Sequence, residues 1–326
     1  MKILKNTLRP YEHTLTNGMH RAGTIVEFVD SQSRRGWGDI APLPKWSKET
    51  LEEATHQFHD QIEKLTTIDW NPENCSAEIS KLELLPSVSF AIESAILSLI
   101  APLGAYEVQK SALFMGSPEE ILKQAQFRKN EGHVSAKLKV SHLSFKEAAA
   151  LILQLKDQFF LRIDVNRAWS TEESLRFFSQ FPLTTFDYVE EPFQNPKDLA
   201  QFLHPLAIDE SFPSDLSLEE LEALPKLKAL IYKPTIQGGI SSCKPLYEWT
   251  KHRGVSLVMS SSFESDIGIA CVASMAHRLG LKAPVGMGTY DYLNHHLNHE
   301  IVLFSNGRAR ISPLSPRNYR LLELRQ

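Results

Sequence analysis

A repeated alternation of apolar runs and helix-like segments is the feature that most limits how this chain can fold. From about residue 110 onward, seven apolar runs end near Met115, Val140, Asp164, Glu190, Asp209, Lys233 and Ser260. A turn or cap signal opens each helix-like segment, and an eighth apolar piece lies around residues 283–285. Strands that alternate with helices pair in parallel through right-handed crossovers. The pattern therefore predicts an α/β fold, a TIM barrel of the (β/α)7β type.

The first hundred residues show a different pattern, in which short predicted strands are followed by predicted helices. Residues 24–29 and 36–40 predict two strands of a small antiparallel sheet. A helix is expected to begin after Ser47 as its N-cap and to end near Leu65. A second helix, over residues 87–100, is apolar on most sides, which predicts that it is buried.

The C-terminal part predicts a hairpin. Residues 302–304 and 309–311 are strand-like and flank Asn306-Gly307, a dipeptide typical of tight hairpin turns. We expect this hairpin to return to the N-terminal sheet. The predicted organisation therefore has three parts, namely an α+β capping domain (1–105), the barrel (106–295) and a C-terminal segment that completes the cap (296–326).

Composition and charge exclude several classes of protein. The 326 residues include 35 Lys and Arg against 39 Asp and Glu, a net charge of −4 without the basic stripe of a nucleic-acid-binding protein. The longest apolar stretch, 95–103, is too short to cross a bilayer, and the N-terminus lacks the apolar core of a signal peptide. The 3 cysteines have neither disulfide nor metal-ligand spacing. We expect a cytoplasmic protein without nucleic-acid or membrane partners; the sequence leaves the oligomeric state open, and a monomer is compatible with it.

Charged residues stand where five successive apolar runs end. The intervals from Lys139 to Asp164, Glu190, Asp209 and Lys233 are 25, 26, 19 and 24 residues, about one strand–helix unit each. A single acidic residue at a strand end is usually a helix cap or a solvated loop residue. Five charged residues at the ends of successive strands are hard to obtain by accident. In TIM-barrel enzymes, the active site lies at the C-terminal rim of the barrel. We therefore expect one site at this rim.

The three carboxylates of this set argue for a metal ion. Asp164, Glu190 and Asp209 would repel each other strongly at one point unless a cation lay between them. Hard oxygen ligands in that number favour Mg²⁺, with Mn²⁺ as a possible substitute.

The lysines indicate proton transfer. Lys137 and Lys139 are two residues apart on one predicted strand and therefore share a face, and Lys233 arrives from the opposite side. An exposed edge strand is the usual explanation of a Lys-x-Lys strand, but strands of a parallel barrel are buried on both faces. Like charges held close should lower a lysine pKa, so that the neutral amine can act as a base. A metal and opposing lysines suit removal of a proton α to a carboxylate.

The same residues form motifs that are known from one family. The chain resembles the enolase superfamily in Lys137-x-Lys139, Asp164-x-Asn166, Glu190-Glu191-Pro192, Asp209-Glu210-Ser211 and Lys233-Pro234. Within that superfamily it is similar to the o-succinylbenzoate synthase family in the stretches 36–44, 164–169 and 260–265. The resemblance covers residues 20–295, approximately the whole of the two predicted domains.

The resemblance implies roles for the metal ligands and the lysines. It makes Asp164, Glu190 and Asp209 the Mg²⁺ ligands. Lys139 would remove the α-proton and then protonate the departing hydroxyl on the same face. Lys137 would tune Lys139, and Lys233 would stabilise the enediolate from the other side.

The resemblance also implies the surroundings of the substrate. The Ser260-Ser261-Ser262 turn and the Gly286-Met287 loop would meet a succinyl carboxylate through backbone N–H groups and hydroxyls. The loop over residues 13–23 would reach the substrate from the capping domain. The remaining expected site residues are Arg162, which points the same way as Asp164, and the supporting residues Asn166 and Glu210.

The implied reaction is the Mg²⁺-dependent syn dehydration of a small carboxylate, 2-succinyl-6-hydroxy-2,4-cyclohexadiene-1-carboxylate, to 2-succinylbenzoate in menaquinone biosynthesis. N-acylamino acid racemases, dipeptide epimerases and muconate cycloisomerases use nearly the same set of residues and remain alternatives. A non-catalytic barrel that binds a carboxylate or scaffolds other proteins is a third possibility. It predicts the loss of at least one metal or lysine position, and none is missing from this sequence.

Overall fold

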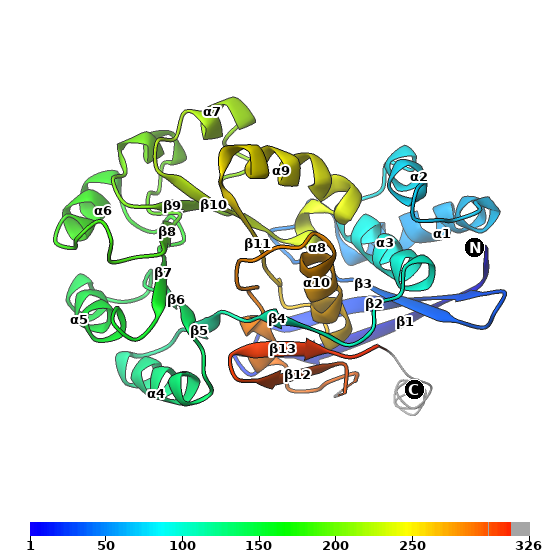
Figure 1. The fold of residues 1–326 in the computed structure, drawn as a ribbon, viewed down its shortest axis with the longest axis horizontal. Helices are drawn as coiled ribbons and strands as arrows, with labels where there is room; N and C mark the ends of the chain where they lie inside the picture. The colour runs from blue at the N-terminus through cyan, green and yellow to red at the C-terminus, as the bar shows by residue number, and fades with distance from the viewer. Residues whose placement is uncertain (299, 314–326) are drawn as a thin grey trace.

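The computed structural model describes residues 1–298 and 300–313 and contains a barrel flanked by two small antiparallel sheets (Figure 1). The elements follow the chain in the order β1 (Ile3–Thr14), β2 (His20–Asp30), β3 (Arg35–Ile40), α1 (Leu51–Thr67), α2 (Cys75–Lys81), α3 (Pro86–Ile100), β4 (Tyr106–Gln109), β5 (Ala112–Phe114), α4 (Pro118–Asn130), β6 (Ser135–Lys139), α5 (Phe145–Leu155), β7 (Phe160–Asp164), α6 (Thr171–Phe178), β8 (Tyr188–Glu190), the 3₁₀ helix η1 (Pro196–Gln201), β9 (Leu206–Ile208), α7 (Leu218–Glu222), β10 (Leu227–Tyr232), α8 (Pro234–Gln237), α9 (Ile240–Arg253), β11 (Ser256–Met259), α10 (Asp266–Arg278), the 3₁₀ helix η2 (Gly288–Tyr292), β12 (Val302–Ser305) and β13 (Arg308–Ile311).

The barrel is built from a seven-stranded parallel sheet in the order β11-β10-β9-β8-β7-β6-β5. The predicted eighth apolar piece closes it through two parallel bridges. Val285 pairs with Lys110, just before β5, and Gly286 pairs with Ser260, just after β11. The curled sheet thus becomes a ring, and the predicted barrel is confirmed.

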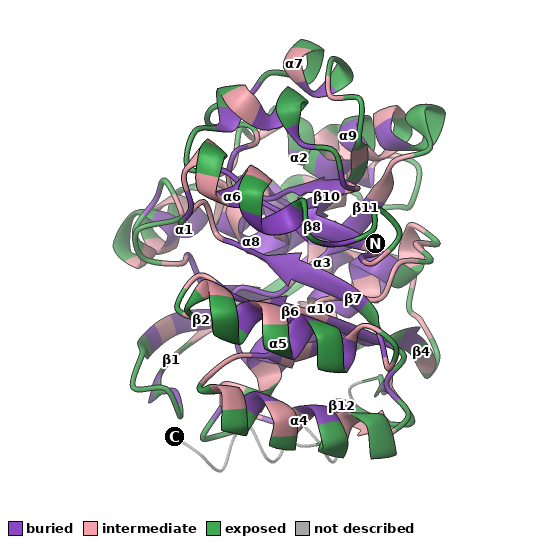
Figure 2. Cartoon of the chain, turned by 90° about the vertical axis from the view of Figure 1, so that its left-hand side faces the viewer, coloured by how far each residue is buried: buried purple, intermediate pink, exposed green. Residues whose placement is uncertain are grey.

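The barrel helices begin where side chains satisfy their free backbone N–H groups. Ser117, Ser144, Ser170 and Ser217 each accept a hydrogen bond from the residue three positions later, in capping boxes with a glutamate there. Figure 2 shows α4, α5 and α6 exposed on their outer faces, with buried strands behind them. Ser214, three residues earlier, is the other candidate cap for α7, but only Ser217 is followed by a glutamate three residues on.

The N-terminal sheet has the order β1-β2-β3 and packs against α3, which is buried as predicted. The first helix begins later than expected. Its N-cap is Thr50, in a capping box with Glu53, rather than Ser47. The carboxylate of Glu49 is used elsewhere and accepts the backbone N–H of Ser87 at 2.9 Å, which ties this loop to the start of α3.

The packing of β3 on α3 requires glycine at position 38. A Cβ atom at Gly38 would lie 1.9 Å from the carbonyl oxygen of Ala91 in α3. We expect Gly38→Ala to lower the free energy of unfolding by about 1–3 kcal/mol or more, because backbone atoms must shift to admit the methyl group. Urea unfolding measures this effect. Gly104→Ala is the control, because nothing lies within 4 Å of its Cβ position, and equal stability of both variants would contradict the account.

The C-terminal hairpin forms as predicted, but its partner differs from the prediction. β12 and β13 pair with each other, and β13 then pairs with β4 in a separate three-stranded sheet, not with the N-terminal sheet (Figure 1). A local pattern of alternating residues shows that a strand forms, but does not show which free edge it joins. The rest of the predicted C-terminal segment, residues 314–326, lies outside the described residues.

None of the helices within the described part of the chain combines the length and apolar character that a bilayer crossing requires. Cys75, Cys243 and Cys271 are all free thiols.

Candidate active site

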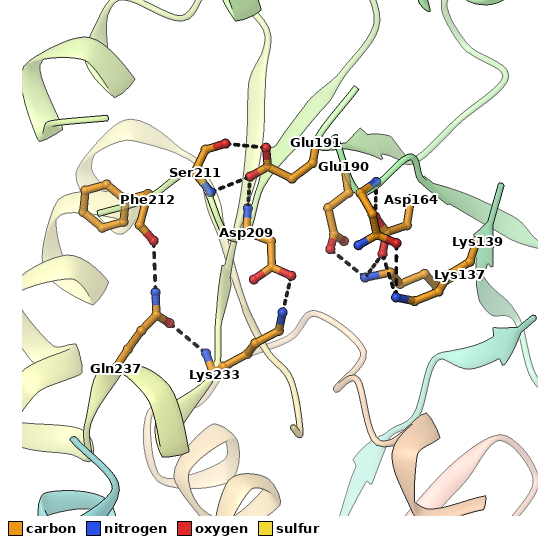
Figure 3. A network of polar contacts seen from close by, with 11 residues as sticks. Lys137, Lys139, Asp164, Glu190, Glu191, Asp209, Ser211, Phe212, Lys233 and Gln237 are labelled. Carbon is orange, nitrogen blue, oxygen red and sulfur yellow. Dashed lines mark hydrogen bonds and ion pairs between the residues drawn. The ribbon is translucent and has the colours of Figure 1, made fainter. Parts of the chain in front are cut away.

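The ends of neighbouring barrel strands bring the predicted charged residues together. Lys139 on β6 pairs in register with Asp164 on β7, and Asp164 pairs with Glu190 on β8. Glu190 then pairs with Ala207 on β9, and Asp209, two residues further on, faces the same side. Lys233 directly follows β10. In Figure 3 the carboxylates lie between Lys137 and Lys139 on one side and Lys233 on the other.

The lysines contact the carboxylates directly. The ammonium of Lys137 lies 2.8 Å from Asp164 Oδ2 and 2.6 Å from Glu190 Oε1. Lys139 lies 3.6 Å from Asp164 Oδ2 and donates to Asn166 Oδ1 at 3.2 Å. Asp164, Glu190 and Asp209 are buried, whereas the lysine side chains retain about a fifth to a third of their exposure, up to 30% for Lys139. The carboxylates are therefore shielded from solvent, whereas the lysine side chains are partly exposed.

The electrostatic prediction for the lysine pair is wrong at Lys137. Burial alone would lower the pKa of Lys137, but the neighbouring carboxylates of Asp164 and Glu190 outweigh burial and raise this pKa well above its ordinary value. Burial likewise would lower the pKa of Lys233, yet its contact with Asp209 raises it. The closest charges to the Lys137 amine are these carboxylates, and not the ammonium of Lys139.

A cavity of about 330 Å³ opens above these groups. The strand-end lysines and carboxylates form its floor, and Asn17, Met19, Leu43 and Trp46 enter from the N-terminal part of the chain. The first two belong to the predicted 13–23 loop. The Trp46 ring lies over Lys233, with 5.6 Å between the ammonium nitrogen and the ring centroid. A larger cavity of about 410 Å³, between α3 and α10, contains none of the predicted site residues.

The serine turn lines the cavity, but its backbone is not available to an anion. The N–H groups of Ser260, Ser261 and Ser262 donate to Tyr232 O, Gly286 O and the Glu264 carboxylate, respectively. The expected backbone contacts with a carboxylate are therefore excluded in this conformation. The hydroxyl of Ser262 is buried and has no hydrogen-bond partner within the described part of the chain.

Three further residues that were expected at the site do not lie as predicted. Met287 is fully buried and does not line the cavity, whereas its neighbours Gly286 and Gly288 do. Arg162 lines the cavity, but its guanidinium is ion-paired with Asp187 at 2.9 Å. Glu210 is half-buried and lies outside the cavity lining.

Three site residues escaped the sequence analysis. Trp46 lies just beyond the 36–44 stretch that carries the family resemblance. Thr289 lines the cavity and is hydrogen-bonded to Ser261, a contact that joins segments 28 residues apart. Glu191 was quoted only as part of a motif, although its carboxylate contacts the segment that carries Asp209. Trp46 stands beside a motif and Glu191 within one, whereas no sequence signal pointed to Thr289.

The three carboxylates do not surround a common point as they stand. Among residues 1–298 and 300–313, no three His, Cys, Asp or Glu side chains lie close enough to hold a metal ion. The ammonium of Lys137 lies between Asp164 and Glu190, and Lys233 holds Asp209. The lysines thus supply the positive charge at this point.

The donor set nevertheless fits a divalent cation. Its oxygens belong to side chains at or just beyond the ends of neighbouring strands, which are about 4.8 Å apart. Glu190 Oε2 is buried and has no hydrogen-bond partner among the residues that the structure describes. Three carboxylates, together with water and substrate oxygens, are a ligand set that Mg²⁺ prefers.

Comparisons with known proteins agree with this architecture. Residues 14–99 match the family model described as "MenC, N-terminal domain", and residues 120–315 match "Enolase C-terminal domain-like". The o-succinylbenzoate synthase of Haemophilus influenzae is 33% identical over 287 residues, which cover 84% of this chain and 84% of that protein.

Solved structures share the fold at lower identity. A dipeptide epimerase from Methylococcus capsulatus, complexed with Mg and the dipeptide L-Arg-D-Lys, has a TM-score of 0.80 and 21% identity, covering 96% of this chain and 98% of that chain. MenC from Desulfotalea psychrophila LSv54 has a TM-score of 0.76 and 19% identity, covering 95% of this chain and 100% of that chain. At such identities, the likeness establishes the fold.

Proposed function

Because this chain belongs to the o-succinylbenzoate synthase family of the enolase superfamily, and so is a carbon–oxygen lyase, we propose that it catalyses Mg²⁺-dependent syn dehydration of 2-succinyl-6-hydroxy-2,4-cyclohexadiene-1-carboxylate. The products are 2-succinylbenzoate and water, and the reaction belongs to menaquinone biosynthesis. The observation that carries the proposal is the arrangement of three buried carboxylates between opposing lysines on the floor of one cavity.

Asp164, Glu190 and Asp209 would hold the Mg²⁺ ion. When bound, the ion supplies positive charge that stabilises the oxygens of the substrate carboxylate as they gain negative charge. The donor set and the free oxygen of Glu190 support this assignment. So does the solved dipeptide epimerase of the same fold, which was crystallised with Mg.

Lys139 acts as the base and then as the acid. Its amine takes the proton from C1, and the C–H electron pair moves into the adjacent carboxylate, which becomes an enediolate. This electron pair then returns to form the C1–C6 double bond. The C6–O bond then breaks, and the hydroxyl leaves with its electron pair and with the proton that Lys139 returns, so water and an aromatic ring form. One side chain can perform both transfers because the proton and the hydroxyl leave from the same face. The contact of Lys139 with Asn166 orients the amine.

Lys137 and Lys233 carry out electrostatic roles. Lys137 is tied to Asp164 and Glu190 and holds these carboxylates in place beside Lys139. Lys233, on the opposite side, places its positive charge near the enediolate that forms when the proton leaves. Trp46 lies over Lys233 and lines that side of the cavity.

Turnover by the purified protein tests this proposal. With Mg²⁺ present, the diene substrate should be converted to 2-succinylbenzoate, which is followed by the loss of the diene absorbance. Removal of the metal with EDTA should stop the reaction, and added Mg²⁺ should restore it. No turnover with Mg²⁺, or turnover that EDTA does not affect, would contradict the proposal.

Racemisation of N-acylamino acids is the second candidate. The position of Lys233 opposite Lys139 favours it, because proton transfer on both faces of a carbon requires two opposed amines (Figure 3). Incubation with N-succinyl amino acids in D₂O distinguishes the two activities. Exchange of the α-proton and loss of optical purity would indicate a racemase, and the absence of both would indicate a dedicated synthase. The cytoplasmic location and the division at residues 105 and 295 stay predictions.

A further inference from the structure

Glu191 is a strained and buried residue at the end of β8. It follows Glu190, precedes Pro192, and has φ of 46°, in the left-handed region. Its side chain is fully buried. A left-handed conformation of a residue other than glycine costs about 1–3 kcal/mol and persists only where the surroundings hold it in place. This position therefore indicates a function for Glu191 itself.

The carboxylate of Glu191 binds the segment that follows the next strand. Its Oε1 accepts the backbone N–H of Asp209 at 2.8 Å and that of Ser211 at 2.9 Å. Its Oε2 accepts the Ser211 hydroxyl at 2.5 Å. Figure 3 shows these contacts converging on one side chain. Both oxygens are thus used, and all three donors belong to the turn that carries Asp209.

The backbone of Glu191 joins the neighbouring strand ends as well. Its N–H donates to Ala207 O at 3.2 Å, and its carbonyl accepts the N–H of Arg167 at 3.0 Å. β9 ends at Ile208, so Asp209 lies just beyond the strand, and its own N–H is bonded to the Glu191 side chain. The Glu191 side chain therefore fixes the backbone from which the Asp209 carboxylate extends, while Lys233 binds the carboxylate itself.

We propose that Glu191 is a positioning residue that fixes Asp209 in the orientation required to bind a divalent cation together with Asp164 and Glu190. The proposal rests on the cation site of the proposed function. Glu191 acts through its length and its three hydrogen bonds, not through its charge, and it does not contact the ion.

Two substitutions separate length from charge. Glu191→Gln keeps the length, since its carbonyl oxygen can accept both N–H groups and its amide can donate to the Ser211 hydroxyl. Glu191→Asp keeps the charge but shortens the side chain by about 1.5 Å, so the three contacts cannot all form. Isothermal titration with Mn²⁺ measures the affinity of each variant. Glu147→Asp and Glu147→Gln, in the exposed capping box of α5, are the matched controls.

We expect Glu191→Asp to raise the Mn²⁺ dissociation constant about 10-fold or more, and Glu191→Gln to change it less than about 3-fold. Wild-type affinity in Glu191→Asp, or weaker binding by Glu191→Gln than by Glu191→Asp, would overturn the proposal. If Glu191→Asp fails to fold, Ser211→Ala provides the test, because it removes one of the three contacts, and an unchanged affinity overturns the proposal. If the wild type does not bind Mn²⁺, both the cation site and this inference are overturned. If the wild type binds Mn²⁺ tightly and both Glu191 variants bind it with the same affinity, only this inference is overturned.

Discussion

Replacing Lys139 with alanine is expected to reduce kcat on the diene substrate by about 10³-fold or more, because the reaction loses both its base and its acid. Lys139 lies on the cavity floor with its amine beside Asp164 and Asn166, so no backbone contact depends on it. The affinity for Mn²⁺ should change little, since the three carboxylates remain. Steady-state kinetics and Mn²⁺ titration of the same preparation measure both quantities.

Lys123→Ala is the matched control for this prediction. Lys123 is largely exposed on α4, where it pairs with Glu119, and its loss should leave kcat unchanged. Turnover by Lys139→Ala at the wild-type rate would remove the proposed base from the mechanism. A loss of Mn²⁺ binding in that variant would instead mean that Lys139 supports the site and does not transfer the proton.

Glu190→Gln is expected to reduce turnover by about 10²–10³-fold even at high Mg²⁺ concentration. The substitution keeps the shape of the side chain but replaces a charged ligand with a neutral amide, and several kcal/mol of transition-state stabilisation depend on the ion. Circular dichroism should show an intact fold, because Lys137 keeps its contact with Asp164.

Glu173→Gln controls for the loss of one carboxylate. Glu173 is the third residue of α6 and belongs to its capping box, remote from the cavity. It should show wild-type kinetics. If Glu190→Gln were fully active at low Mg²⁺ concentration, Glu190 would not be a ligand, and the buried oxygen without a partner would need another explanation.

The barrel could be predicted because local sequence signals mark the end of each strand. An apolar run followed by a charged residue and a serine cap repeats along the chain, and no long-range information is needed to read it. β1 escaped prediction because it is the edge strand of its sheet and most of its residues are exposed or half-buried, so the alternating pattern is absent. The partner of the C-terminal hairpin also escaped, because pairing depends on which edges are free in three dimensions.

The charged residues of the site could be predicted for the same reason, since parallel strands present their C-terminal ends at one rim. Their electrostatics could not, because the pKa of Lys137 depends on carboxylates from two other strands. The use of the Ser262 N–H by Glu264 and the role of Glu191 likewise depend on contacts that a spacing does not encode. The sequence therefore indicated which groups meet, and the structure shows how each is held.

Anomalous diffraction from crystals grown with Mn²⁺ tests the central idea most directly. A single Mn²⁺ peak is expected, with one oxygen each of Asp164, Glu190 and Asp209 at about the 2.0–2.2 Å of a hard-cation oxygen bond, and with lysine amines on both sides of the ion. A peak at another position, or none in crystals of protein that turns over the substrate, would contradict a reaction built on these three carboxylates.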